Sequence, residues 1–300
     1  MIAVEINGLT KFYGKSMGVA DLNFSIGEGE IYGFIGPNGA GKSTTIRLLL
    51  NLLFPTRGSG KIFGRDMVKD SPSIKKQIGF VPSEVHYYER MTVRELLQYS
   101  ARFFGIDFDQ RHQYLIDALD LDITRKIADL SMGNKKKVAV VQSLLHRPRL
   151  LILDEPTSGL DPLMQSRFFE ILKKENMQGT TIFFSSHILA EVQKFCHRVA
   201  IIKDGRIVDE EDIISMKEKS LSRVTYYLRE GTQSNFPVLP GIISAEKVEQ
   251  GLTFLYKGDM SALLKELQVL PIDKLTITEP DLEEVFMHYY EDGSRKEEYQ

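Results

Sequence analysis

Gly36-Pro37-Asn38-Gly39-Ala40-Gly41-Lys42-Ser43, followed by Thr44, is the most informative segment of this 300-residue chain. The segment fits G-x-x-x-x-G-K-[ST], the pattern of a loop that binds phosphate groups. Because glycine has no Cβ atom, such a loop bends tightly enough for its N–H groups to face phosphate oxygens. We expect Lys42 to reach the β- and γ-phosphates of a nucleotide, and the hydroxyl of Ser43 to hold Mg²⁺.

The residues on either side of this segment support the same interpretation. Glu30–Ile35 is an apolar run typical of a buried strand, and Thr44–Leu50 has the pattern of a helix. The dipole of a helix that starts at the loop adds to the attraction for an anion. The sequence therefore predicts a nucleotide-binding α/β domain.

Composition limits the other classes of function. A hydrophobic content of 42% in 300 residues allows one large domain or two smaller ones with substantial cores. The chain has 38 basic and 41 acidic residues, a net charge of −3, so we expect no bulk attraction to nucleic acid. The basic run Lys135–Lys137 is interpreted as a solvated helix face. The single cysteine, Cys196, excludes an internal disulfide and is expected to be a packed small residue.

The sequence predicts a soluble chain. Residues 1–6 lack the basic and then apolar pattern of a secretion signal. No run approaches the roughly 18–20 apolar residues that cross a bilayer. If the protein works at a membrane, we expect another polypeptide to supply the membrane spans.

Strand patterns precede and follow a long helical segment. A small antiparallel sheet is expected ahead of the phosphate loop, and residues 55–60 are expected to be loop. Residues 91–146 are mostly helical in pattern, and Thr92 with Glu95 forms a capping box at the first helix. The remaining elements expected in this part of the chain are strands at 2–6, 19–26, 61–63 and 78–82, a helix at 109–119, and a hairpin at 198–208.

Two carboxylates end the most apolar run. Leu150–Leu153 leads directly into Asp154 and Glu155, which places both acids at the carboxyl end of a predicted parallel strand, where open α/β sheets bind ligands. We expect Asp154 to position Mg²⁺ and Glu155 to polarise the attacking water. His187 ends another predicted strand, residues 179–187, and is placed to contact the γ-phosphate.

Tyr13 has two interpretations from spacing alone. It lies 29 residues before Lys42 (42 − 13), on the expected flank of the nucleotide site. It either stacks on the adenine ring or is a half-buried strand residue.

In order and spacing, these motifs resemble the ATP-binding cassette (ABC) ATPases over residues 2 to about 215. The motifs are the phosphate loop, the helical insert, Leu130–Asn134, Asp154-Glu155, Ser158–Asp161 and His187. The resemblance implies ATP and Mg²⁺ as cofactors. It also implies an α/β fold with a P-loop core of ABC type, an antiparallel β subdomain, and a helical subdomain at about 84–146 within a domain of residues 1–215.

The resemblance also assigns roles across a dimer. Leu130–Asn134 is similar to the signature loop of the family, whose Ser131, Gly133 and Asn134 positions cap the γ-phosphate bound to the opposite subunit. The residues agree with this, because Ser131 is placed to cap a helix and present its N–H groups to a phosphate. Ser158–Asp161 resembles the loop that joins the two sites. Tyr13 falls where the family stacks an aromatic ring on adenine, and His187 resembles the switch histidine.

Three positions depart from the family pattern. Met132 replaces a common glycine, which requires that its backbone does not adopt φ > 0. Asn134 replaces glutamine and keeps the amide on a shorter side chain. Ser83 stands where the family has a glutamine that contacts Mg²⁺ and water, so that contact is either lost or shifted to Glu84.

Residues after about 216 form a second region. Met216–Ser220 is predicted to be a charged linker, and residues 221–300 a small α+β domain. It resembles an extension on ATPases of bacterial drug- and ion-efflux transporters, whose ends carry a stretch similar to Asp281–Phe286. We expect a packing or dimer-supporting role. The predicted elements are strands at 224–228, 241–248, 252–256 and 274–278, and helices at 261–267 and 280–290.

The first functional hypothesis is the energy-coupling ATPase subunit of a membrane transporter, an exporter, held on the inner face of the membrane by its permease. A partner helix is expected near Ser83–Arg90, where Val85, Tyr87 and Tyr88 are available to it. The second hypothesis is a non-transport ATPase acting on DNA or ribosomes, and the third is a regulator without turnover. The single cassette and the acidic balance disfavour the second, and Glu155 disfavours the third. The cargo, the direction of transport, and pairing with the same chain or a paralogue stay open at this level.

Overall fold

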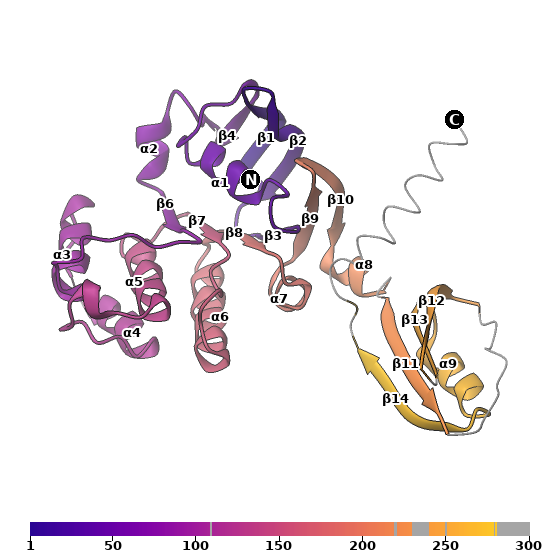
Figure 1. The fold of residues 1–300 in the computed structure, drawn as a ribbon. Helices are drawn as coiled ribbons and strands as arrows, with labels where there is room; N and C mark the ends of the chain where they lie inside the picture. Colours follow the sequence, from indigo (N-terminus) through magenta and orange to yellow (C-terminus); the bar gives the residue numbers. More distant parts are fainter. Residues whose placement is uncertain (109, 219–220, 230–239, 250, 279, 281–300) are drawn as a thin grey trace. The chain divides into compact units, whose positions relative to one another are not determined.

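The computed structural model describes residues 1–108, 110–218, 221–229, 240–249, 251–278 and 280. The chain divides into two compact units, Met1–Ile213 and Ile214–Gln300 (Figure 1). Each unit has a hydrophobic core of its own.

The first unit is built on a six-stranded sheet with the order β10-β9-β3-β8-β7-β6. All neighbours are parallel except β10, which pairs antiparallel with β9. Every residue of β3, β7 and β8 is buried, which explains why these strands are mostly apolar, with the polar residues Asp154, Ser185 and Ser186 at their carboxyl ends. The predicted strands and the closing hairpin are confirmed. The strands are β3 (Ile31–Ile35), β6 (Ile78–Val81), β7 (Leu150–Asp154), β8 (Thr181–Ser186), β9 (Arg198–Lys203) and β10 (Arg206–Asp212).

An antiparallel sheet, β2-β1-β4-β5, completes the strands of this unit. The loop predicted at 55–60 is confirmed for residues 55–56 and wrong for residues 57–60, because β4 already begins at Arg57 and pairs with β1. Its glycines made the segment resemble a loop. They are instead needed for close pairing, since a Cβ on Gly58 would lie 2.2 Å from the carbonyl oxygen of Gly8. The strands are β1 (Ile2–Tyr13), β2 (Ser16–Gly27), β4 (Arg57–Ile62) and β5 (Arg65–Asp66).

An aromatic cluster joins the two sheets and supports the strand that leads into the phosphate loop. Phe24 of β2 lies 5.7 Å from Tyr32 and 5.8 Å from Phe34 of β3, measured between ring centroids. Phe34 in turn lies 5.3 Å from Phe183 of β8. All four rings are buried, so β3 is held from both sheets by apolar contact.

The predicted helical insert is confirmed between β6 and β7, and its helices gather on one side of the unit (Figure 1). Thr92 and Glu95 form the predicted capping box. The sequence patterns did not indicate α2, α6 or α7. The helices of the unit are α1 (Lys42–Leu49), α2 (Ser71–Lys75), α3 (Val93–Phe103), α4 (Gln110–Ala118), α5 (Met132–Leu144), α6 (Pro162–Met177) and α7 (Leu189–Phe195), with a 3₁₀ turn at Ile127–Asp129.

The second unit contains a four-stranded antiparallel sheet with the order β12-β13-β11-β14, and a helix, α9. The predicted strands, hairpin and first helix are confirmed. The predicted helix at 280–290 and the Asp281–Phe286 stretch lie outside the described residues. The charged linker predicted at 216–220 is helical up to Glu218, where α8 ends. The elements are α8 (Ile213–Glu218), β11 (Ser222–Leu228), β12 (Ile242–Val248), β13 (Gly251–Tyr256), α9 (Met260–Leu267) and β14 (Ile272–Thr278).

No helix in the described part of the chain is both long and apolar enough to cross a bilayer.

The capping box generates a stability prediction. Thr92 accepts a hydrogen bond from the Glu95 N–H at 3.2 Å and donates its own N–H to Glu95 Oε2 at 2.8 Å. We expect Thr92→Ala to lower the free energy of unfolding by about 1 kcal/mol, because the α3 amide loses its acceptor. Urea unfolding followed by circular dichroism measures the change. Thr92→Ser keeps the hydroxyl and is the control, and an alanine variant as stable as the serine variant contradicts the capping role.

Candidate functional site

The phosphate loop, Asp154, Glu155 and His187 lie at one edge of the six-stranded sheet. Strands β3, β8 and β7 are parallel neighbours, and all three end at this edge. The phosphate loop follows β3, Glu155 follows β7, and His187 follows β8. The strand order therefore brings together residues that are more than 100 positions apart in the sequence, as expected for the ligand-binding edge of an α/β sheet.

The phosphate loop is shaped by its glycines. Gly39 and Gly41 have φ values of 83° and 109°, a backbone conformation that favours glycine. A Cβ on Gly36 would lie 2.3 Å from the carbonyl oxygen of Ile202, so the loop passes directly against β9. The Gly205 N–H donates to the Ala40 carbonyl at 3.0 Å and fixes the far side of the loop. Asn38 stands exposed on the loop between these anchors.

Helix α1 begins directly after the loop. Gly41 occupies the N-cap position and makes no side-chain cap, so the first amides of the helix have no side-chain acceptor from this position. Ser43 and Thr44 lie half-buried in the first turn. An uncapped helix start with a glycine loop in front of it is a favourable place for a phosphate.

Lys42 is buried and turns back toward the loop. Its ammonium donates to the carbonyl oxygens of Gly36 at 2.8 Å and Pro37 at 3.1 Å. Nζ also lies 3.2 Å from Oε1 of Glu155. The positive charge is thus held between the loop and the end of β7, where a phosphate group can compete for it.

Glu155 connects two of the predicted catalytic residues. Its Oε1 faces Lys42, and its Oε2 lies 3.3 Å from Nδ1 of His187. Its backbone has φ 46°, an uncommon conformation for a non-glycine residue that costs energy and often occurs at functional sites. The Glu155 N–H donates to the carbonyl and to the hydroxyl oxygen of Ser185, at 3.2 and 3.3 Å, which stabilises the turn.

Asp154 and Ser43 fit the requirements of Mg²⁺. Asp154 is buried at the end of β7, where the hydroxyl of Ser185 donates to its Oδ1 at 2.9 Å. Among the described residues no cluster of three or more His, Cys, Asp or Glu side chains is suited to a metal. Mg²⁺ is commonly bound by one or two protein oxygens together with substrate phosphates and water, so one carboxylate and one hydroxyl are a suitable donor set.

Tyr13 lies at the end of β1 next to the phosphate loop, and 45% of its surface is exposed. Gly18 lies between the Tyr13 ring and the phosphate loop. A Cβ on Gly18 would lie 2.7 Å from the Tyr13 ring. A Cβ on Gly41, in the loop, would lie 3.0 Å from the Gly18 carbonyl oxygen. The ammonium of Lys11 lies 5.6 Å from the centre of the ring. Tyr13 is therefore an exposed aromatic surface beside the loop rather than part of the core.

The signature residues form the start of α5. Ser131 is the N-cap and accepts a hydrogen bond from the Asn134 N–H at 3.3 Å, as predicted. Met132 is helical and 74% exposed, so it does not need a positive φ. A Cβ on Gly133 would lie 2.7 Å from the Gly159 carbonyl oxygen, which places the Ser158–Asp161 loop against the signature loop. Ser131 and Met132 are exposed, whereas Gly133 and Asn134 are half-buried beside that loop.

Lys136 was missed as a site residue. The interpretation of Lys135–Lys137 as a solvated face is wrong at this position, because Lys136 is only 3% exposed. Burial lowers the pKa of its ammonium to about 8, and the negative charges of Asp154 and Glu155 act in the opposite direction. Its position four residues before the buried Val140 is the signal that indicates an inward-facing side chain.

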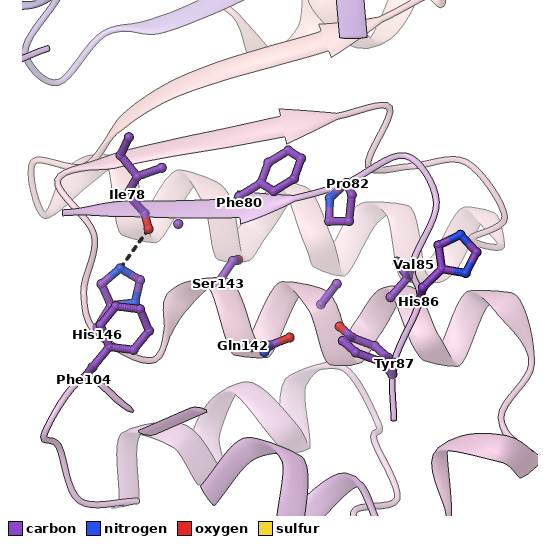
Figure 2. A pocket seen from close by; sticks show the side chains of 12 residues that line it. Ile78, Phe80, Pro82, Val85, His86, Tyr87, Phe104, Gln142, Ser143 and His146 are labelled. Atoms are coloured by element: carbon purple, nitrogen blue, oxygen red, sulfur yellow. Dashed lines mark hydrogen bonds between the residues drawn. The ribbon is translucent and has the colours of Figure 1, made fainter. Parts of the chain in front are cut away.

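A pocket of about 280 Å³ lies between β6, the segment that follows it, and α5. Figure 2 shows Val85 and Tyr87 on that segment, together with Gln142 and His146 of the opposite wall. Tyr87 is half-buried, and burial raises the pKa of its hydroxyl, whereas Tyr88 is 69% exposed. Of the aromatic residues predicted to be exposed for a partner, Tyr88 is thus exposed and Tyr87 lines the pocket.

Similarity to known proteins agrees with this geometry. Residues 19–158 match the family model described as ABC transporter. The chain is 33% identical over 299 residues to the bacitracin transport ATP-binding protein of Bacillus licheniformis. The alignment covers 95% of this chain and 96% of that protein. It is 28% identical to the Nod factor export ATP-binding protein I of Rhizobium sp. (strain N33), over 95% of this chain and 96% of that protein.

A solved structure supports the fold and the chemistry. A dimeric ATP-binding cassette in a post-hydrolysis state, bound to ADP and Pi, superposes with a TM-score of 0.64 at 26% identity, covering 70% of this chain and 98% of that one. The resemblance seen in the sequence is thereby confirmed, including the P-loop α/β fold. The chain belongs to the ATP-binding proteins of ABC transporters and is an ATPase.

Proposed function

We propose that this ATPase energises export through separate membrane-spanning subunits, by closing with a second cassette on MgATP and opening after hydrolysis. The observation that carries the proposal is the position of Glu155, held between Lys42 and His187 at the ligand-binding edge of the sheet. A carboxylate between a phosphate-binding lysine and a histidine is suited to activating water for attack on a γ-phosphate.

Lys42 and Glu155 change partners when the nucleotide binds. The phosphate oxygens of ATP attract the Lys42 ammonium more strongly than the carbonyl oxygens of Gly36 and Pro37 do, because they are charged. Glu155 is then released from Lys42 and is free to accept a proton from water, with His187 on its other side. Mg²⁺, when bound at Ser43 and Asp154, supplies positive charge beside the β- and γ-phosphates.

The loop backbone and Tyr13 complete the nucleotide site. The amides from Gly36 to Thr44 surround the phosphates, and Tyr13 stacks on adenine. This assignment is supported by the exposed ring beside the loop and by the uncapped start of α1.

The γ-phosphate needs a second cassette. Ser131, which is exposed, and the half-buried Gly133 and Asn134 form a helix start that suits a phosphate bound to another subunit. The dimeric cassette bound to ADP and Pi supports a head-to-tail pair of this kind. A second copy of this chain is the simplest partner, and an accessory domain of residues 221–300 would support the pair.

Transport requires a permease, which we place at the pocket beside β6. The pocket is lined by β6, which pairs with the strand that ends at Asp154, and by α5, which begins after Ser131. A partner helix bound there would therefore contact elements of both the acid site and the signature site. The names of relatives, one for bacitracin transport and one for Nod factor export, support an exporter. Such an arrangement holds the chain peripherally on the cytoplasmic face of the membrane.

Blocked hydrolysis tests the proposal directly. In Glu155→Gln the base is removed and the charge on Lys42 is no longer paired with a carboxylate. We expect ATP hydrolysis to fall by roughly 10²–10⁴-fold. We also expect a stable dimer with MgATP and a monomer or loose dimer without it. Light scattering after gel filtration measures the mass of both forms.

Glu170→Gln is the matched control, since Glu170 is an exposed glutamate on α6 and the same charge is removed. It is expected to hydrolyse ATP like the wild type and to form no stable dimer. A Glu155→Gln protein that binds ATP and stays monomeric contradicts a dimer of identical chains. Unchanged hydrolysis in that variant contradicts the proposed role of Glu155.

The permease site generates a second prediction. We expect Tyr87→Ala to lower the fraction of protein that sediments with membranes of the native host, because the pocket loses an aromatic wall. ATP hydrolysis by the purified subunit is expected to stay within about twofold of wild type, since Tyr87 lies outside the nucleotide site. Tyr99→Ala, which removes an exposed aromatic ring of α3, is the control. Equal sedimentation of both variants contradicts a partner at this pocket.

A further inference from the structure

Lys136 of α5 reaches across to the end of the neighbouring strand β6. Its ammonium donates to the carbonyl oxygens of Pro82 at 2.8 Å and Ser83 at 2.9 Å. These residues directly follow Val81, the last residue of β6. Hydrogen bonds from a charged donor are stronger than neutral ones, and this donor is only 3% exposed, so water competes weakly for it.

The two carbonyl groups lie beside the candidate catalytic acids. Val81 pairs with Leu153 in the parallel ladder, so the residues after β6 run next to Asp154 and Glu155. Both carboxylates interact with the Lys136 charge. Burying an ammonium costs free energy that nearby negative charge and carbonyl acceptors offset. The lysine is thus surrounded by the groups that a buried cation requires.

The same helix presents the signature residues. Ser131 caps α5, and Lys136 lies on the helix five positions later. One side chain therefore joins the helix that carries the outward-facing phosphate site to the backbone beside the acids of this chain's own site. The contact is made to backbone carbonyls, so it does not depend on the side chain at position 83.

We propose that Lys136 is a positioning residue for ATP hydrolysis, which holds the Pro82–Ser83 backbone against α5 and beside Asp154 and Glu155. This role rests on the proposed function of the site. Without the ammonium, two partly buried carbonyl oxygens lose their donor and the segment shifts away from the acids. Misplacement of about 1 Å at a reacting centre costs roughly 100-fold in rate, so hydrolysis is affected more than ATP binding.

Three variants of the full chain test the proposal. Lys136→Met removes the charge and the donors at similar length. We expect its kcat for MgATP to fall roughly 10- to 100-fold while KM stays within about threefold. We also expect faster amide hydrogen exchange in residues 83–90 of the nucleotide-free protein, measured by mass spectrometry. Lys136→Arg keeps a charged donor and is expected to restore most of kcat and of the protection from exchange.

Lys137→Met is the matched control, because Lys137 is on the same helix and its ammonium donates to the Asp120 carbonyl at 3.5 Å instead. It is expected to keep kcat and the exchange of residues 83–90 close to wild type. If Lys136→Met does not fold, Lys136→Gln removes the charge and leaves neutral N–H donors on a shorter side chain, and it is expected to lower kcat and the protection from exchange less than the loss of both would.

Two results overturn the proposal. One is a Lys136→Met protein with wild-type kcat and exchange. The other is a loss of kcat that Lys136→Arg does not restore, with unchanged exchange at residues 83–90. A wild-type protein that does not hydrolyse ATP would overturn the proposed function instead, and the exchange measurement still reports on the contact of Lys136 with the segment.

Discussion

The contact between Lys42 and Glu155, 3.2 Å from Nζ to Oε1, depends on the whole parallel sheet. Lys42 starts the helix after β3, and Glu155 follows β7, two strands away in the sheet. The strands reach the same edge because their ladders are in parallel register with β8 between them. The aromatic cluster beside β3 packs that strand against β2 and β8, so core packing sets the distance between the Lys42 ammonium and the Glu155 carboxylate.

The geometry at this edge combines stable elements with local strain. The strands are fully buried, while Glu155 has φ 46° and is stabilised by Ser185. A buried sheet compensates for the energy of an uncommon backbone conformation at its end, which a surface loop does less well. In this way Glu155 faces Lys42 and His187 while Asp154, one residue earlier, stays buried beside Ser185.

Helix α5 links two parts of the molecule. Ser131 at its start is exposed and Gly133 is half-buried, and its second turn carries Lys136 inward to the backbone after β6. The pocket beside β6 lies farther along the same helix, at Gln142. In the proposed function, this helix would couple a permease at the pocket to the nucleotide site.

Features that depend on residues close together in the chain were predicted from the sequence, whereas features that depend on distant residues were not. The capping box at Thr92 and the cap at Ser131 were predicted correctly, because a cap is a hydrogen bond between residues three apart in the chain. The strand that ends at Asp154 was predicted for a similar reason, since a strand buried on both faces is a nearly continuous apolar run. Gly58 of β4 was assigned to a loop because the contact that requires a glycine there, close approach to Gly8, is made to a different strand.

By itself the sequence predicted the glycine-rich loop between a buried strand and a helix, the carboxylates at the end of a strand, and the caps of two helices. These properties depend on residues close together in the chain, or on a motif whose chemistry is local. The tertiary structure alone decided that Lys136 is buried, that Glu155 contacts both Lys42 and His187, and that Tyr87 lines a pocket. Burial and long-range contact depend on what packs against a residue, and the partner elements come from distant parts of the chain.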